Sequence, residues 1–318
     1  MNYTILVAAA GRRLAFRDMA HNYTVDPLDV YSIPSARVHL LIGRRNSGKT
    51  TLLTDILYQH QNRLEFGIAI AGSIGSAVDI RKYHPDTYIY EDFDPVVLEK
   101  FWQKVRAING KLRRRGEQMV NFYVILDDTG FDERMWNDKT LKAMMMNGRQ
   151  YNLDMYMCLQ YMKGITTSMR GQVDYCYIFK EKAPDNIKKL YDTFAGGYFE
   201  NRFVFESVFR TCTLDHRALV VRNSDNPDED GDFEGGILFY KASASHPPFT
   251  IGNDEMWRSH WAKYNDHYES DEEGKFESGG QDASLQSAPG APRKRGDMSV
   301  QLRRQKPDAS AIVKLAPS

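Results

Sequence analysis

The sequence predicts a three-layer α/β fold with a mostly parallel sheet. Short apolar runs alternate along the chain with segments of helical periodicity, and strands that alternate with helices form parallel sheets covered by helices on both faces. The apolar run at residues 38–42 ends at a glycine and is followed at once by a helical segment at 50–61. Hydrophobic residues make up 42% of the 318 residues, which is enough for a sizeable core and excludes a wholly disordered or fibrous chain.

The remaining elements are expected in the same alternation. Strands are predicted at residues 66–71, 88–91, 123–126, 155–159, 173–179, 218–221 and 237–240. Helices are predicted at residues 95–115, at 134–149, where Met is frequent, and from Pro184 onward, with an apolar face made of Ile187, Leu190, Tyr191 and Phe194. Residues 1–35 are mixed in character, and the residues there that favour loops are Asp26, Pro27, Ser32 and Pro34.

We expect three parts along the chain: an N-terminal extension (1–35), one α/β domain (36–264) and a disordered charged tail (265–318). The tail is rich in Ser, Gly, Pro and charged residues, acidic first and basic later, and almost lacks large apolar side chains. It therefore cannot bury enough surface to offset the entropy lost on ordering. A second acidic segment, 226–236, is expected to be a loop between two strands.

Charge and cysteine usage restrict the class of protein. Lys and Arg (42) balance Asp and Glu (42), so any nucleic acid must be bound through local basic patches. The chain lacks both a stretch of about 18 apolar residues that could span a membrane and the basic start of a secretory signal. Cys158, Cys176 and Cys212 lie in apolar surroundings outside any CxxC pair, so they are expected to be buried free thiols in a reducing compartment. These features predict a soluble, intracellular protein that is not secreted.

A phosphate-binding loop is the strongest motif. The segment GRRNSGKT matches G-x-x-x-x-G-K-[ST] completely, between a predicted strand and a predicted helix. Loop amides and the helix N-terminus would hold the phosphates, Lys49 would reach the β- and γ-phosphates, and Thr50 would ligate Mg²⁺. The residues assigned to ATP binding are Gly43, Arg44, Arg45, Asn46, Ser47, Gly48, Lys49, Thr50 and Thr51.

Two points about this loop stay open. A glycine turn in front of a helix is the alternative to a phosphate site. Arg44 and Arg45 are compatible with contacts to phosphate, to a neighbouring subunit or to solvent.

Acidic and amide residues at later strand ends complete the predicted site. Asp127 and Asp128 end an apolar strand, and adjacent carboxylates there are costly unless a cation lies beside them. Asp127 would hold Mg²⁺ and Asp128 would orient the attacking water, whereas a polar strand end at a turn is the alternative. Gln160 ends the next strand and would sense the γ-phosphate or position the water. Further strands between the loop and the acids favour an additional-strand, RecA-like P-loop NTPase over a simple nucleoside kinase.

The ordered motifs resemble a known family. The set IGRRNSGKTTLL, YVILDDTG, MMNGRQYNLDMYMCLQ and the late pair LVVRN and GGILFYKA is similar to the DNA-packaging ATPases of nucleocytoplasmic large DNA viruses and virophages, within the FtsK/HerA superfamily. The resemblance covers roughly residues 36–242, and the NGR segment followed by a strand and Gln is its most discriminating part. It implies an ATP- and Mg²⁺-dependent motor that drives double-stranded DNA into a capsid.

The resemblance also implies residue roles and partners. Arg149 is the first candidate for an arginine finger supplied to a neighbouring subunit, and Arg170 is the second, whereas the alternative for Arg149 is a cation at a helix C-terminus. The implied partners are double-stranded DNA bound without sequence specificity, a homo-oligomeric ring, and a capsid or portal-vertex protein. The implied location is the host cytoplasm, a viral factory or the virion.

The chain departs from the family pattern at two places. Many members carry Asp-Glu where this chain has Asp127 and Asp128, and aspartate reaches one methylene less far toward the water. Gln150 stands where several relatives have histidine, a departure for which we have no physical account.

A motor of this kind grips phosphates through Lys and Arg without reading bases. The candidate basic clusters are residues 111–115, 81–82, 180–182 and 293–295, and for each the alternative is a solvated charged surface. Two other functions remain compatible with the motifs: a DNA translocase or helicase of the same superfamily that does not package, and a slow P-loop nucleotide switch or assembly scaffold.

Overall fold

The computed structural model describes residues 4–7, 14–17, 22–129, 133–161, 165–223 and 236–263. The strands are β1 (Thr4–Val7), β2 (Leu14–Arg17), β3 (Asn22–Pro27), β4 (Val38–Ile42), β5 (Phe66–Ala71), β6 (Ile89–Tyr90), β7 (Phe122–Asp127), β8 (Leu153–Leu159), β9 (Tyr175–Ile178), β10 (Ala218–Arg222) and β11 (Ile237–Tyr240). The helices are α1 (Lys49–His60), α2 (Ile74–Arg81), α3 (Pro95–Arg115), α4 (Glu133–Asn137), α5 (Lys139–Asn147), α6 (Thr167–Arg170), α7 (Pro184–Leu190), α8 (Arg202–Cys212) and α10 (Asp254–Lys263). Single helical turns occupy Asp86–Tyr88, Gly148–Tyr151 and Tyr191–Ala195.

The described strands form one sheet in the order β1-β2-β3-β11-β10-β9-β4-β8-β7-β5-β6. The block from β9 to β6 is parallel throughout, β10 and β11 form an antiparallel hairpin beside it, and β3 joins β11 in parallel. The predicted α/β class with a mostly parallel sheet is confirmed. The strand β8 lies between β4, which leads into the phosphate loop, and β7, which leads into the acids, so the predicted additional strand is also confirmed.

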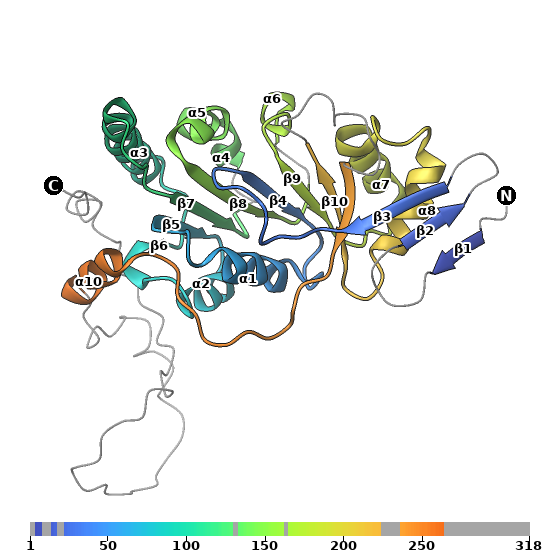
Figure 1. Cartoon of the computed structure of the whole chain (residues 1–318), viewed down its shortest axis with the longest axis horizontal. Helices are drawn as coiled ribbons and strands as arrows, with labels where there is room; N and C mark the ends of the chain where they lie inside the picture. The colour runs from blue at the N-terminus through green and yellow to red at the C-terminus, as the bar shows by residue number, and fades with distance from the viewer. Residues whose placement is uncertain are drawn as a thin grey trace, which may run out of the picture.

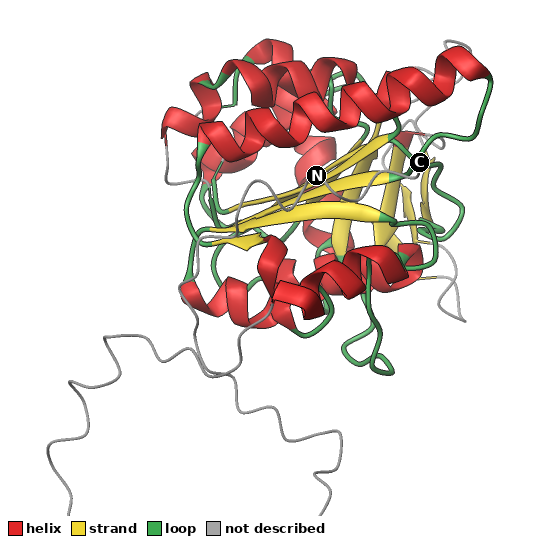
Figure 2. Ribbon diagram, turned by 90° about the vertical axis from the view of Figure 1, so that its left-hand side faces the viewer, coloured by secondary structure: helices red, strands yellow, loops and turns green. Residues whose placement is uncertain are grey.

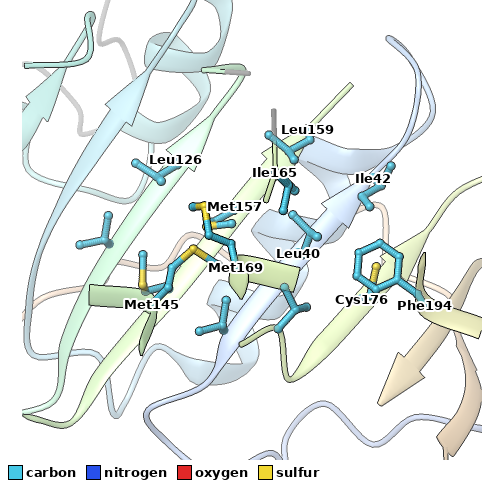
Figure 3. Close-up of a cluster of buried hydrophobic side chains, with 14 of the residues drawn as sticks. Leu40, Ile42, Leu126, Met145, Met157, Leu159, Ile165, Met169, Cys176 and Phe194 are labelled. Atoms are coloured by element: carbon cyan, nitrogen blue, oxygen red, sulfur yellow. The ribbon is translucent and has the colours of Figure 1, made fainter. Parts of the chain in front are cut away.

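Helices cover both faces of the sheet, because its central strands are apolar on both sides (Figures 1 and 2). Alternate residues of β4 divide between two cores: Leu40 and Ile42 pack with α3 and α5, whereas Leu41 packs with α1 and α2. Figure 3 shows the first core, where Met157 of β8 points toward Met145 of α5 and Met169 of α6. The flexible methionines fill the irregular space between two short helices and the sheet.

Helix α3 forms as its sequence predicts. Asp94 caps its N-terminus by accepting a 2.9 Å hydrogen bond from the Val96 amide, Pro95 occupies the first helical position, and Gly116 ends it in the left-handed conformation at φ 69°. Its apolar stripe includes the buried side chains of Phe101 and Val105. The helix runs from the carboxyl end of β6 to the amino end of β7, and its basic last turn therefore lies at the edge of the sheet where β7 begins.

Some sequence predictions were wrong in detail. The Met-rich segment expected as one helix at 134–149 is broken into α4, α5 and a helical turn, because Asp138 adopts an extended conformation and caps α5 through the Leu141 amide. Asp26 and Pro27, expected in a loop, end β3 instead, where they pair with β11. Helices α2, α8 and α10 were not predicted at all.

Other expectations concern membrane spans, thiols and the tail. No helix in the described part of the chain is long and apolar enough to cross a membrane. Cys158, Cys176 and Cys212 are free and buried, as expected. The predicted disordered tail, the greater part of the acidic segment 226–236 and the basic cluster 293–295 lie outside the described residues.

Candidate active site

The loop between β4 and α1 has the backbone geometry that a phosphate cradle requires. Gly48 has φ 101° and Asn46 has φ 60°, both in the left-handed region, so the chain reverses tightly before the helix. A Cβ atom at Gly43 would lie 2.8 Å from the Cβ of Phe179, so only glycine fits where the loop leaves β4. The two glycines of the motif are therefore required by local geometry.

The loop opens α1 without a side-chain cap. The N-cap residue is Gly48, which has no side chain to cap the first turn. The first amides of a helix have no partner within the helix, and together with the helix dipole they attract an anion. Lys49 begins the helix, and its Nζ donates to the carbonyls of Gly43 at 2.6 Å and Arg44 at 2.9 Å. Its ammonium group is thus held over the loop. Burial lowers the pKa of Lys49, while nearby groups that include Asp127 and Asp128 raise it.

Asp127 ends β7 in a buried position. Its Oδ2 accepts a 2.6 Å hydrogen bond from Ser76 Oγ on α2. Desolvation raises the pKa of Asp127 above its usual range, although hydrogen bonds from Ser76 and Cys158 act in the opposite direction. A bound cation nearby would favour the ionised carboxylate.

Asp128 and Gln160 meet although they follow different strands. Gln160 Nε2, just after β8, donates a 2.5 Å hydrogen bond to Asp128 Oδ1, just after β7. Asp128 has φ 54°, a left-handed backbone that is uncommon for a residue other than glycine. Sparsely populated conformations of this kind concentrate at functional sites.

These groups converge on one cavity of about 450 Å³ at the carboxyl edge of the sheet. Six of the assigned loop residues line it, namely Arg45, Asn46, Gly48, Lys49, Thr50 and Thr51, together with Asp127, Asp128 and Gln160. Gly43, Arg44 and Ser47 support the loop without lining the cavity. The Arg44 guanidinium lies 2.6 Å from the Glu181 carboxylate, a partner that the sequence did not indicate.

The sequence reasoning missed four cavity residues: Ser73, Ser76, Asp79 and His216. Ser73 caps α2 by accepting a hydrogen bond from the Ser76 amide, so the serines after the strand at 66–71 were a usable signal for a helix start. His216 comes from the turn before β10, where Asp215 (φ 54°) and His216 (φ 60°) are both left-handed. Nothing in the sequence around His216 predicts that position.

The predicted finger Arg149 lies far from this cavity. It follows α5 in the helical turn that leads into the amino end of β8, and it pairs with Asp174, which precedes β9. Asp174 also accepts a 2.8 Å hydrogen bond from the Val38 amide at the start of β4. Arg149 is therefore at the opposite edge of the sheet from its own phosphate loop, with 53% of its side chain exposed. Arg170 ends the short helix α6 between β8 and β9.

The predicted basic clusters differ in their surroundings. Arg81 and Lys82 lie at the C-terminal end of α2, where Arg81 pairs with Asp86 and Glu91 and Lys82 pairs with Asp79. Residues 180–182 follow β9 at the carboxyl edge of the sheet, and residues 111–115 end α3 at the amino edge.

The cavity offers oxygen ligands of the type that Mg²⁺ prefers. The Thr50 hydroxyl and the buried Asp127 carboxylate line the same wall, and Mg²⁺ commonly takes one or two protein oxygens while phosphates and waters supply the rest. The described residues contain no group of three or more His, Cys, Asp or Glu side chains that could hold a metal alone. The donor set thus fits Mg²⁺ bound together with a nucleotide.

The chain has sequence relatives among large DNA viruses. No protein-family model matches it. It is 27% identical over 237 residues to uncharacterized protein L437 of Acanthamoeba polyphaga mimivirus, a match that covers 73% of this chain and 81% of that protein. It is 26% identical over 206 residues to uncharacterized protein 015R of Frog virus 3, covering 65% and 62%. A match to uncharacterized protein 075L of Invertebrate iridescent virus 6 has 24% identity and covers 64% and 76%.

The structural neighbours include viral genome-packaging NTPases. The NTPase B204 of Sulfolobus turreted icosahedral virus 2, solved with ATP-gammaS, is 16% identical with a TM-score of 0.42, and the match covers 65% of this chain and 97% of that one. The conjugation coupling protein TcpA of pCW3 is 13% identical with a TM-score of 0.43, covering 76% and 65%. The sequence relatives confirm the resemblance to proteins of nucleocytoplasmic large DNA viruses that the motifs indicate.

Proposed function

We propose that this protein is a Mg²⁺-dependent ATPase that translocates double-stranded DNA and packages a viral genome into a capsid. The observation that carries the proposal is the meeting of Lys49, Thr50, Asp127 and the Asp128–Gln160 pair in one cavity, although they follow three different strands. A phosphate cradle, an oxygen site for a cation and a group that can accept a proton are the parts that phosphoryl transfer to water requires.

The phosphates bind first in this scheme. The uncapped start of α1 and the Lys49 ammonium group hold the β- and γ-phosphates. Thr50 and Asp127 hold the cation, and Ser76 fixes the rotamer of Asp127 by its 2.6 Å hydrogen bond. Bound Mg²⁺ neutralises charge on the β- and γ-phosphate oxygens.

The attacking water is activated at the next strand ends. Asp128 orients the water in line with the γ-phosphate and accepts its proton, and Gln160 fixes Asp128 in place. His216 faces the same cavity from the turn before β10 and contributes to its wall.

A second subunit completes the site. Because Arg149 lies at the opposite edge of the sheet from its own loop, it can reach ATP only in a neighbouring subunit, as a finger that acts between members of a homo-oligomeric ring. Lys180 and Lys182, at the carboxyl edge, are candidate contacts for DNA phosphates. A capsid or portal-vertex protein would be the docking partner, in the host cytoplasm, a viral factory or the virion.

Steady-state ATP hydrolysis measured against protein concentration, with and without linear duplex DNA, tests this function. We expect turnover per subunit that rises steeply with concentration and increases further with DNA. Turnover indifferent to both would leave an ATP site but favour a slow nucleotide switch over a motor. DNA-stimulated turnover without uptake of DNA into purified capsids would favour a translocase that does not package.

A further inference from the structure

A second cavity of about 510 Å³ opens beside the phosphate cavity. The two share three lining residues, Thr50, Thr51 and Asp79, so a ligand bound at the start of α1 can extend from one into the other. Volumes of this size are typical of small-molecule sites.

Three segments distant in sequence form the second cavity. The first turns of α1 contribute Thr50, Thr51 and Thr54, and the end of α2 with the two residues after it contributes Asp79, Lys82 and Tyr83. The third wall is the segment 243–249 after β11, which we call the strap; its lining residues are Ser243, Ala244, His246, Pro247, Pro248 and Phe249. Figure 1 shows the chain leaving β11 and passing along α1 and α2 on its way to α10.

The strap is fixed to α1 by a buried carboxylate. Asp55, whose side chain is only 1% exposed, accepts hydrogen bonds from Tyr240 Oη at 2.7 Å and from the Ser243 amide at 3.1 Å. Its Oδ1 also lies 3.3 Å from His246 Nε2. These contacts hold both the start and the middle of the strap over α1.

Aromatic contacts fix the rest of the strap. The His246 ring stacks on Tyr58 of α1 with centroids 4.5 Å apart, and the Phe249 ring stacks on Tyr83 with centroids 5.1 Å apart. The strap thus gives the second cavity one wall that contains proline, histidine and phenylalanine side chains. The inner wall, from α1 and the end of α2, carries threonine hydroxyls, a carboxylate and an ammonium group.

We propose that the second cavity binds the purine base and ribose of the nucleotide, and that the strap is the wall on which the base packs. This assignment rests on the proposed nucleotide-binding function. The phosphates fix the starting point, because Thr50 and Thr51 belong to both cavities. Flat rings pack well against proline and aromatic side chains, and the polar groups of the inner wall suit a ribose.

The affinities of two ligands, measured by calorimetry in the presence of Mg²⁺, distinguish a failure of this proposal from a failure of the proposed function. ATP carries the base and ribose, whereas inorganic tripolyphosphate has only the phosphates. Ala244 is exposed and lines the cavity, so Ala244→Trp places a bulky ring in it without disturbing the core. Ser245 is the exposed neighbour that does not line it, so Ser245→Trp is the matched control.

We expect Ala244→Trp to weaken ATP binding about tenfold or more, because the indole ring occupies the space of the base, and to leave tripolyphosphate binding unchanged. Ser245→Trp should change neither, and Lys49→Ala should weaken both. Normal ATP affinity in Ala244→Trp, or equal loss for both ligands, would overturn the base site while the Lys49→Ala result still supports the phosphate site. A wild-type protein that binds neither ligand would refute the proposed function itself.

Photolabelling gives a second readout that does not depend on a variant. With 8-azido-ATP and Mg²⁺, the label should lie on a peptide that contains residues 79–83 or 241–250, and excess ATP should prevent it. A competed label confined to other segments would overturn the assignment.

Discussion

Gln160 donates a 2.5 Å hydrogen bond from its Nε2 to Asp128 Oδ1, and so joins the ends of two neighbouring parallel strands, β8 and β7. Asp128 is held there in a left-handed backbone conformation. The amide and the carboxylate therefore act as one unit, in which Gln160 sets the direction of the group that would accept a proton from water. The first prediction follows from this relationship.

Replacing Gln160 should change catalysis more than binding. In Gln160→Ala we expect kcat to fall by about 10-fold to 100-fold while the affinity for ATP stays within about twofold, since general-base catalysis depends on position. In Gln160→Glu the donor amide is replaced by a second carboxylate, which repels Asp128, so we expect kcat to fall at least as far as in Gln160→Ala. A kcat equal to that of the wild type in either variant would contradict this role, as would a loss of ATP binding in either variant.

Lys49→Ala should abolish hydrolysis. The ammonium group donates to two carbonyls of the loop whose amide groups would hold the phosphates, and removing one charge that stabilises the transition state costs about 10²–10³ in rate or more. Release of phosphate from ATP measures the effect. The control is Lys100→Ala, which removes an exposed lysine of α3 that lines neither cavity and should retain most of the activity. Normal turnover by Lys49→Ala would refute the ATP site.

As pH is lowered, Mg²⁺ binding should begin to weaken at a higher pH than it would if Asp127 had the pKa of an ordinary aspartate. Desolvation raises the pKa of Asp127, so its carboxylate is protonated, and unable to bind a cation, over a wider acid range. The Mg²⁺ concentration for half-maximal hydrolysis should therefore increase as pH falls. Ser76→Ala removes a hydrogen bond that lowers this pKa, so its curve should lie at higher pH still. Ser32→Ala, an exposed serine elsewhere, is the control, and superimposable curves for all three proteins would contradict the role of Ser76.

Arg149 can be tested as a finger by mixing two defective subunits. Arg149→Ala alone should lose about 10³-fold in hydrolysis. Because the Asp174 side chain is only 6% exposed and would lose this partner, the free energy of unfolding of the variant is measured alongside. Arg149→Ala keeps an intact phosphate loop, and Lys49→Ala keeps an intact arginine. A mixture of the two should therefore regain hydrolysis that neither protein has alone, whereas failure to regain it would argue for a purely structural pair between Arg149 and Asp174.

Two buried histidines should make the fold sensitive to acid. Desolvation lowers the pKa values of His60 and His84 from about 6.5 to about 3. Between these two pH values both histidines are therefore neutral in the folded protein but protonated in the unfolded chain. Their contribution to stability is complete above pH 6.5 and is lost as pH falls toward 3, by about 1.4 kcal/mol per pH unit for each histidine. Buried Asp154 acts in the opposite direction, because its pKa is raised to about 6.

The variant His84→Gln isolates one of these contributions. It should be less stable than the wild type at pH 7.5, because the buried ring packs against Tyr123 and its Nδ1 contacts the Pro85 carbonyl at 3.0 Å. That deficit should shrink as pH is lowered from 6.5, since the variant has no imidazole to protonate on unfolding. Denaturant unfolding at several pH values measures it. Parallel dependences on pH for the two proteins would show that His84 does not contribute as described.

The part of the site that comes from consecutive residues could be predicted from the sequence. Strand β4, the loop and α1 follow one another without a gap, and Asp127, Asp128 and Gln160 each end an apolar run. Parallel strands bring such ends to one edge of the sheet, so the convergence needed no knowledge of distant contacts. The order of the strands could also be anticipated in part, because the acids come too late in the chain for β7 to be the next strand after the loop.

The remaining features depend on contacts between segments far apart. The last two residues of β3, Asp26 and Pro27, pair with β11, which is more than two hundred residues later, whereas alone they favour a loop. The apolar periodicity of the Met-rich segment continues past Asp138, so the periodicity alone predicts one unbroken helix. The break arises because the Asp138 backbone is extended. His216 and the strap reach the cavities only through the turn before β10 and the path after β11. Local patterns carry no information about such meetings.

Helix α10 has a consequence for solubility. Its Ser259 accepts a 3.1 Å hydrogen bond from Tyr88, and its His260 contacts Thr87, so the helix lies against the residues that lead into β6, the last strand of the sheet on that side. An uncovered final strand offers unpaired backbone groups to other chains, and short length or a covering helix prevents such pairing. A chain cut before residue 254 would lose this cover and should self-associate through β6. The helix that ends the described chain thus protects the sheet from aggregation.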